Sequence, residues 1–375
     1  MNFPQNKQIN KKKVVFLQKH QTYITMNREL RLGNISKYRG ELMGFAIIIV
    51  MLFHVSLSRN SPWFGLRRMG NLGVDIFFFL SGIGLWYSWT KQQCYRHFYL
   101  NRALRIYPAW LIIAGYYYIS RFRVGHSSYA LPFGGTGDAT ADSYIDLAGD
   151  ILFNWDFWLY DELTFWYVPA TMMMYIFAPL YMQLLRKERT FQWLTVLPLM
   201  WCIIMMYVVP VHKAVGHIEI FWSRIPIFML GINCAEAVRQ KQTLGKHTWW
   251  MILGFFALSL WACVWLEQNR HGKFPLYTER MLYIVMAITT IFIMSEIFDK
   301  FENCRLKFLN KFFAWVGGIS LEIYLLHVQF VLIPIEKNHW GYWTSFFLTL
   351  AISLPIAWII SKICGLIINK VKKLI

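Results

Sequence analysis

Apolar stretches of roughly 20 residues alternate with short polar segments along most of this chain. A bilayer core requires about 20 apolar residues per helix, so each such stretch is a candidate span. The pattern predicts an all-α polytopic membrane protein with roughly ten transmembrane helices. The expected spans are residues 40–58, 71–89, 104–120, 165–185, 191–209, 218–237, 248–266, 277–298, 312–335 and 343–368.

Composition supports this class. The 375 residues are 57% hydrophobic and their mean hydropathy is +0.37, whereas soluble domains are about 45–50% apolar. The length requires no second, soluble domain. We expect a basic cytoplasmic tail over residues 1–39, with Met26 as an alternative start, followed by a membrane domain over residues 40–370.

The net charge of +18 arises largely from Lys and Arg at the ends of the expected spans. This distribution follows the positive-inside rule and does not indicate a nucleic-acid partner. Basic residues gather in the N-terminal tail, in alternate loops and at the C-terminus, whereas residues 121–164 are rich in Asp. Both termini are therefore predicted to be cytoplasmic, and residues 121–164 to form an extracytoplasmic loop.

The six cysteines lie mostly in or beside apolar spans. They form no Cys-x-x-Cys pair and no cluster with histidine, so we expect neither disulfides nor a zinc site. No other metal site is predicted.

The long loop divides into two halves. Residues 125–142 contain Gly134-Gly135-Thr136-Gly137 and are expected to be irregular. Residues 144–158 mix acidic with apolar and aromatic residues, which predicts an amphipathic helix on the outer membrane surface or over a cavity. The Trp and Asp residues suit a carbohydrate site, and the alternative is an aromatic belt at the membrane interface.

Two ionisable residues lie within the first two spans. His54 is about three residues before the outer end of the first, and Asp75 about four residues after the start of the second, so at ~1.5 Å per residue their depths match. A carboxylate that holds an imidazole makes an oriented general base. A purely structural hydrogen bond is the alternative.

Further ionisable residues lie in or beside later spans. Arg102 and Arg105 share a helix face at the inner end of the third span, which suits a phosphate clamp, although positive-inside flanking explains such residues as well. Arg224 lies well inside its span. Glu322 and His327 lie in the ninth span, where each is positioned to line the same cavity as His54.

The order of these motifs resembles the membrane-bound acyltransferase family 3, whose members acylate sugars of cell-surface polysaccharides and lipids. The resemblance covers residues 38–365. It rests on His54, Gly73-Val-Asp75-Ile-Phe-Phe-Phe-Leu-Ser81-Gly82, Arg102-x-x-Arg105-Ile-Tyr107-Pro108, Phe165-Trp166-Tyr167-Val168, Arg224-x-Pro226-x-Phe228-x-x-Gly231 and Ser320-x-x-x-Tyr324-Leu-Leu-His327. One position differs from the family pattern. The family usually has an arginine eleven residues before the histidine, where this chain has Met43. The role of that arginine is carried over to Arg39.

The resemblance implies an acyl-CoA donor in the cytoplasm, normally acetyl-CoA, and a glycan or lipid-linked sugar as acceptor, at the plasma (inner) membrane. Arg39, Arg102 and Arg105 would bind the CoA phosphates. His54 lies roughly 18–20 Å from the inner end of its span, about the reach of a pantetheine arm. His54 would act as base or carry the acetyl group.

The resemblance also implies supporting roles at the reacting groups. Asp75 would orient His54, and Arg224 or a backbone N–H would stabilise the oxyanion. Glu322, His327 and Trp166 are the further candidates for contact with substrate.

Two other classes stay open at this point. A transporter or flippase of a lipid-linked sugar would use the intramembrane charges as a proton relay, but no inverted repeat is visible. A polysaccharide polymerase or ligase also combines spans with an outer loop, but the Arg102–Arg105 pair at the inner face favours a CoA donor. The sequence leaves the oligomeric state open and implies no partners beyond acceptor and membrane lipids.

Overall fold

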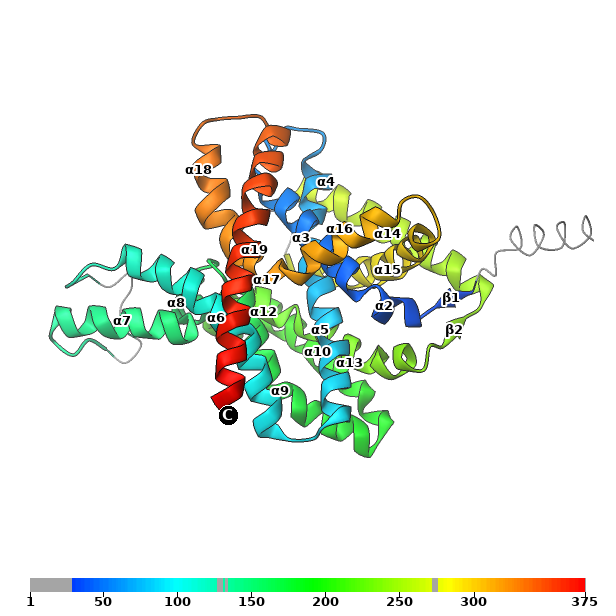
Figure 1. Ribbon diagram of the computed structural model, residues 1–375, viewed down its shortest axis with the longest axis horizontal. Coiled ribbons are helices and arrows are strands. Elements are labelled where there is room, and N and C mark those ends of the chain that lie inside the picture. The colour runs from blue at the N-terminus through cyan, green and yellow to red at the C-terminus, as the bar shows by residue number, and fades with distance from the viewer. Residues whose placement is uncertain (1–28, 127–130, 132–133, 272–275, 375) are drawn as a thin grey trace, which may run out of the picture.

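The computed structural model describes residues 29–126, 131, 134–271 and 276–374, and nearly all of them belong to helices (Figure 1). Seven helices in these ranges are long and apolar enough to cross a bilayer, and a bent pair over residues 307–336 makes an eighth if it counts as one span. The chain is therefore an all-α polytopic membrane protein. Each predicted span overlaps helical residues, but several are divided among two or more helices, so the number of spans stays a prediction.

Helix α5 (Leu72–Lys91) occupies the centre of the molecule and is buried along most of its length. Helix α3 (Arg39–His54) packs against one face of α5, and α13 (Ile225–Arg239) packs against another. A Cβ atom on Gly82 would lie 2.4 Å from the carbonyl oxygen of Phe228, and one on Gly231 would lie 2.2 Å from that of Phe79. Only glycine permits this backbone contact, so the two glycines set the distance between α5 and α13.

Two predicted spans lack the features of a complete apolar span. Helix α3 has only 16 residues, and α6 (Tyr95–Arg121) carries arginines in its first half. The predicted span 312–335 is not one straight helix. It is divided into α16 (Lys307–Gly318) and the segment Ser320–Glu336, which meet at 61°.

The segment after the bend continues as α17 (Ser320–Leu326), the π-helical turn η4 (His327–Leu332) and α18 (Ile333–Glu336). Helix α19 (Tyr342–Leu374) then runs from the turn after α18, at the top of Figure 1, to the C-terminus at the bottom. Helix α9 (Tyr167–Lys187) packs against α5 and α6. The other helices are α4 (Phe64–Arg68), η1 (Met69–Asn71), η2 (Arg189–Thr195), α10 (Val196–Tyr207), α11 (Val209–Val215), η3 (Gly216–Ile218), α12 (Glu219–Trp222), α14 (Lys246–Arg270) and α15 (Leu276–Glu302).

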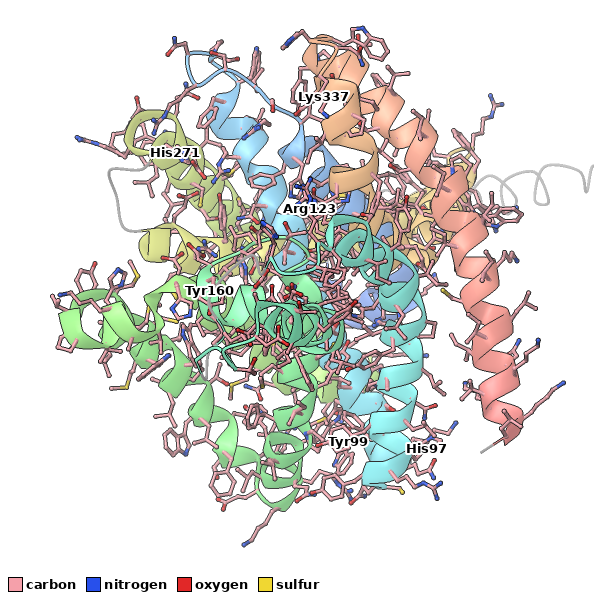
Figure 2. The ribbon with its side chains drawn as sticks, turned by 90° about the vertical axis from the view of Figure 1, so that its left-hand side faces the viewer. His97, Tyr99, Arg123, Tyr160, His271 and Lys337 are labelled. Atoms are coloured by element: carbon pink, nitrogen blue, oxygen red, sulfur yellow. The ribbon has the colours of Figure 1, made fainter. Side chains whose placement is uncertain are left out.

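The segment between α6 and α9 forms a helical cap on one side of the bundle, at the left of Figure 1. It contains α7 (Ala139–Phe153) and α8 (Trp155–Tyr160). The Asp138 side chain begins α7 by accepting a hydrogen bond from the Thr140 N–H at 2.8 Å. A single helix was expected over 144–158, but Asn154 adopts φ 49° and separates α7 from α8. Figure 2 turns this side of the molecule toward the viewer.

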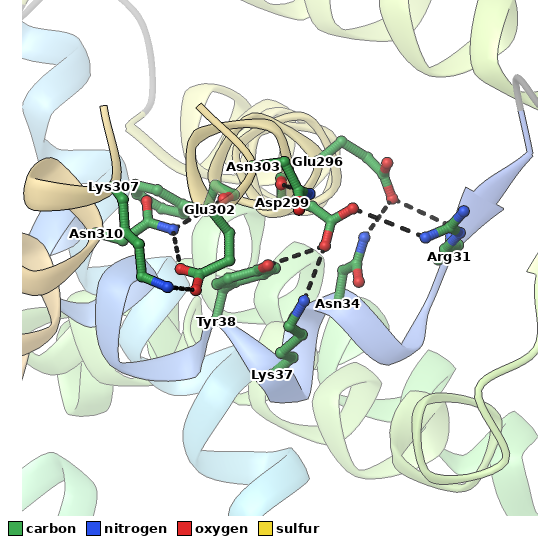
Figure 3. Close-up of polar contacts among 11 residues, drawn as sticks. Arg31, Asn34, Lys37, Tyr38, Glu296, Asp299, Glu302, Asn303, Lys307 and Asn310 are labelled. Atoms are coloured by element: carbon green, nitrogen blue, oxygen red, sulfur yellow. Dashed lines mark hydrogen bonds and ion pairs between the residues drawn. The ribbon is translucent and has the colours of Figure 1, made fainter. Parts of the chain in front are cut away.

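The described end of the N-terminal tail is folded against the membrane domain (Figure 3). Strand β1 (Leu30–Arg31) pairs with β2 (Thr243–Leu244) and leads into α2 (Gly33–Lys37). Asp299 on α15 accepts hydrogen bonds from Lys37 at 3.0 Å and from the Tyr38 hydroxyl at 2.8 Å. The remainder of the predicted tail, including Met26, lies outside the described residues.

Candidate active site

Two histidines from distant parts of the chain meet where α3 ends and η4 begins. His54 is the last residue of α3, and His327 is the first residue of η4. The Nε2 atom of His327 lies 3.3 Å from Nδ1 of His54. His327 is fully buried and His54 is partly buried.

Backbone carbonyls determine the tautomers of both rings. Nδ1 of His54 lies 2.8 Å from the Val50 carbonyl oxygen, and Nδ1 of His327 lies 2.9 Å and 3.0 Å from those of Ile323 and Tyr324. A carbonyl only accepts, so Nδ1 carries the proton in each neutral ring. Nε2 of His54 is then a free base, and it makes no hydrogen bond with the described residues.

The π-helical turn at His327 has a local cause. Pro334 has no backbone N–H and cannot complete the helical bond to the residue four positions earlier, so the preceding turn widens. Such turns often occur at functional sites. Here the widened turn begins at His327, and Nδ1 of His327 contacts two carbonyl oxygens of the preceding helix.

Asp75 does not contact His54, which differs from the predicted arrangement. Its two carboxylate oxygens accept from Nη1 of Arg224 at 2.8 Å and 2.6 Å, and both side chains are fully buried. Gly73 is the residue of α5 that faces α3, because a Cβ atom there would lie 2.3 Å from the Ala46 carbonyl. A residue two positions further is rotated by about 200°, so Asp75 faces away from α3 toward Arg224.

The same ion pair changes the interpretation of Arg224. Its Nη1 is occupied by Asp75, and its Nη2 lies 3.4 Å from the Asn71 side-chain oxygen. The buried ion pair joins α5 to the start of α13, whereas Nε of Arg224 is buried with no hydrogen-bond partner among the described residues. The oxyanion role of Arg224 stays a prediction that the ion pair does not favour. The predicted match of depth was also wrong. The contacts of Gly70 with Ile49 and of Gly73 with Ala46 place Asp75 beside residues 44–48 of α3, at least ~9 Å along the helix from His54.

A narrow cavity of about 60 Å³ brings the three predicted CoA-binding arginines together. Arg39 comes from the start of α3, whereas Arg102 and Arg105 come from the first half of α6. None of the three forms an ion pair with a described carboxylate, and Nε of Arg102 is buried without a hydrogen-bond partner. Unpaired guanidinium groups at one cavity suit an anionic ligand with several phosphates.

The cavity extends from these arginines toward the histidine pair. Val50, whose carbonyl holds His54, lines it, and so does Tyr324, whose ring centroid lies 6.2 Å from that of His327. The remaining polar lining was not predicted from the sequence. It comprises Ser81, Tyr167, Thr171, Tyr175 and Ser320.

Tyr167 and Tyr324 are joined directly. The backbone N–H of Tyr167 donates to the Tyr324 hydroxyl oxygen at 3.1 Å, so the hydroxyl proton of Tyr324 is available to another acceptor. Both residues lie in motifs noted above, but the sequence favoured Trp166 over Tyr167 and assigned Tyr324 to helix packing. Trp166 and Tyr167 are adjacent at the start of α9, so their side chains point in different directions. Tyr167 lines the cavity and Trp166 does not.

Trp166 and Glu322 do not line the cavity. Trp166 is buried next to Phe78 and Phe157, with ring centroids 6.4 Å from each. Glu322 is buried against α19, where it meets Ser361. Their predicted contact with substrate therefore stays a prediction that this geometry does not favour.

Comparison with known proteins identifies one relationship. A family model described as an acyltransferase domain matches residues 42–362, which is nearly the whole chain. The match contains both histidines, Arg102, Arg105 and the Asp75–Arg224 pair, whereas Arg39 precedes it. No curated protein and no solved structure shows a significant match.

Proposed function

Because the chain belongs to the acyltransferase 3 family, whose members transfer acyl groups other than aminoacyl groups, we propose that it is an O-acetyltransferase. The donor is acetyl-CoA from the cytoplasm. The acceptor is a hydroxyl group of a cell-surface polysaccharide or of a lipid-linked sugar, and the membrane is the plasma (inner) membrane.

One observation carries this proposal. A single narrow cavity joins three arginines that lack carboxylate partners to the neighbourhood of the His54–His327 pair. Arg39, Arg102 and Arg105 bind the phosphates of CoA, and the narrow part of the cavity accommodates the pantetheine arm. The thioester then lies near Tyr324, beside the histidines.

In the proposed reaction, Nε2 of His54 takes the proton from the acceptor hydroxyl as its oxygen attacks the thioester carbonyl. The carbon–sulfur bond breaks, and the departing CoA thiolate receives that proton from His54. His327 and the Val50 carbonyl hold the imidazole in the required tautomer, the task assigned to Asp75 from the sequence.

The tetrahedral intermediate requires a hydrogen-bond donor at its oxyanion. Since Arg224 is occupied by Asp75, the Tyr324 hydroxyl takes this role in our proposal. It lines the cavity, and its oxygen already accepts from the Tyr167 N–H, which leaves the proton for donation. An alternative in which Nε2 of His54 attacks the thioester itself predicts an acetylated enzyme in the absence of acceptor.

The test is transfer from radiolabelled acetyl-CoA by the purified protein in detergent. We expect label in the glycan fraction only when both protein and acceptor are present, and label on the protein alone would establish the acetyl-histidine route. If acetyl-CoA neither donates label nor changes the melting temperature, the proposed donor is wrong, and the transporter of a lipid-linked sugar regains support.

A further inference from the structure

Three carboxylates lie together in the cap, away from the histidine pair. Oxygen atoms of Asp146, Asp150 and Asp156 all lie within 4.8 Å of one another. The three side chains retain only 7%, 4% and 5% of their exposure. Such close, buried carboxylates repel one another unless a cation or protons neutralise them.

The local sequence builds this cluster. Asp146 and Asp150 are four residues apart on α7, so they share a helix face. The left-handed conformation of Asn154 turns the chain back, and the N–H of Asp156 then donates to Asp150 Oδ1 at 3.3 Å. Trp155 packs against Gly149, where a Cβ atom would lie 2.2 Å from the indole ring.

Two of the three carboxylates lack a basic partner among the described residues. Neither Asp150 nor Asp156 forms an ion pair with a described Lys or Arg. Arg121, Arg123 and His126 line the same cavity, but Arg121 donates to the Tyr117 hydroxyl.

A second observation points to a ligand. Oδ1 of Asp156 is buried and has no hydrogen-bond partner among the described residues. The three aspartates line a cavity of about 230 Å³, which has room for a cation and several waters. Glu162 and Thr164 line it too and offer further oxygen atoms. Figure 2 labels Arg123, which lines this cavity, on the side of the molecule that carries the cap.

We propose that Asp146, Asp150 and Asp156 bind a calcium ion. The ligand set contains only oxygen, as hard cations require, and calcium accepts six to eight such ligands with flexible geometry. Magnesium demands a stricter octahedron and retains more water. This site is independent of the acyl donor and was not predicted from the sequence.

Calcium binding would fix the cap beside the reaction centre. The ion joins α7 to the start of α8 and faces Thr164, whose hydroxyl accepts from the Gln329 side chain at 3.3 Å. Gln329 is two residues after His327 in the π-helical turn. The cation therefore restrains Thr164 and Gln329, which connect the cap cavity to the turn that carries His327.

The test uses the full-length protein in detergent after removal of metals with EDTA. We expect it to bind one calcium ion per chain by isothermal titration, with a higher melting temperature in calcium at ~1 mM, a concentration typical for extracellular sites. Asp150→Asn and Asp156→Asn should each weaken calcium binding at least ~10-fold, because each removes a charged ligand. Asp161→Asn is the matched control, since Asp161 is exposed in the same segment and asparagine tolerates its φ of 59°.

The two ligand variants should fold, because each relieves repulsion among the carboxylates. In EDTA we expect their melting temperatures to equal or exceed that of the unchanged protein. If millimolar calcium neither binds nor raises the melting temperature of the unchanged protein, the carboxylates share protons and the site is not a metal site. A shift with magnesium but not with calcium would also overturn the proposal.

Discussion

The orientation of His54 depends on backbone carbonyls and on a second histidine. A carboxylate partner would increase the basicity of the imidazole, whereas the Val50 carbonyl and His327 hold its tautomer without adding a negative charge. His54 thus remains a neutral base within the bundle. In the proposed mechanism, His54 performs the chemistry and His327 positions it.

We expect His54→Ala to reduce acetyl transfer by ~10²–10⁴-fold, the usual contribution of a general base. His327→Gln should lower kcat less and leave the KM for acetyl-CoA nearly unchanged, because His327 acts through His54. Initial rates over a range of acetyl-CoA concentrations measure both. His212→Ala is the control, since His212 is exposed and distant in sequence from both histidines. Near-normal transfer by His54→Ala would place the base elsewhere.

The Asp75–Arg224 pair should contribute to stability more than to chemistry. Removing one partner of a buried ion pair leaves an uncompensated charge and costs ~3–5 kcal/mol. We therefore expect Asp75→Asn to lower the melting temperature sharply while the folded fraction retains most of its kcat. The double variant Asp75→Leu/Arg224→Met should recover stability, as apolar replacement of both partners often does. A large loss of kcat in well-folded Asp75→Asn would restore the catalytic role that the sequence suggested.

Sequence reasoning singled out His54, His327, Asp75 and Arg224 but paired His54 with Asp75, whereas the structure places His54 beside His327 and Asp75 beside Arg224. Counting residues from the expected span ends placed His54 and Asp75 at one depth, but Gly70 lies against Ile49 and Gly73 against Ala46, so Asp75 lies well before the level of His54 on α3. The cause is that η1 already packs beside α3 before α5 begins. Residue counting ignores such packing. It does not give the direction of each side chain when a helix is apolar on every face, as α5 is. The small residue Gly73 was the available signal, because close helix contacts favour glycine and Asp75 is two positions away from it.

At the scale of elements, the proposed donor site lies where α3 and α6 begin. Arg39, Arg102 and Arg105 line one cavity although α5 separates their helices in sequence. The positive-inside rule accounts for basic residues at helix ends, but it does not explain why these three arginines line a single cavity. The convergence also explains how Arg39 can serve where the family usually has an arginine at the position of Met43.

We expect Arg102→Ala and Arg105→Ala each to raise the apparent KM for acetyl-CoA, with a smaller effect on kcat. Arg102→Lys and Arg105→Lys should rescue only in part, because lysine lacks the bidentate guanidinium. Arg96→Ala is the control on the same helix, since Arg96 is exposed and does not line the cavity. A folded double variant with an unchanged KM for the donor would remove the phosphate-binding role.

Hydropathy located the helices but not their interruptions. The bend at Ile319 and the break at Asn154 both fall inside stretches whose average composition suits a continuous helix. Averaging over a window conceals such points, which depend on single residues and on tertiary contacts. At the bend, a Cβ atom on Gly317 would lie 2.0 Å from the Gly40 carbonyl oxygen, a contact between elements far apart in sequence.

The contact between α5 and α13 makes a separate prediction about stability. Gly231→Ala would place a methyl group against the Phe79 carbonyl, so we expect a loss of ~1–3 kcal/mol, as for other overpacked cores, and a lower melting temperature. Gly254→Ala in α14 is the matched control, because no atom lies within 4 Å of its Cβ position and alanine favours a helix. Equal melting temperatures for the two variants would mean that the helices can separate without cost.

At the scale of the whole molecule, the proposed reaction requires that the two ends of the cavity face different compartments. The charge distribution predicts that the loops after α5 and after α15 are cytoplasmic and that residues 121–164 are outside. Native cysteines already mark the first two loops, because Cys94 and Cys304 are both exposed. They provide reporters of orientation without substitution.

We expect a membrane-impermeant maleimide to leave Cys94 and Cys304 unlabelled in intact cells and to label both after permeabilisation. In a variant that carries Ala139→Cys, close to Gly135 and exposed at the start of α7, the new thiol should react in intact cells. Mass spectrometry of the labelled peptides distinguishes the three sites. Labelling of Cys94 in intact cells, with protection of the thiol at position 139, would reverse the orientation. The arginines would then face away from the cytoplasmic pool of CoA, and the proposed direction of acetyl transfer would be wrong.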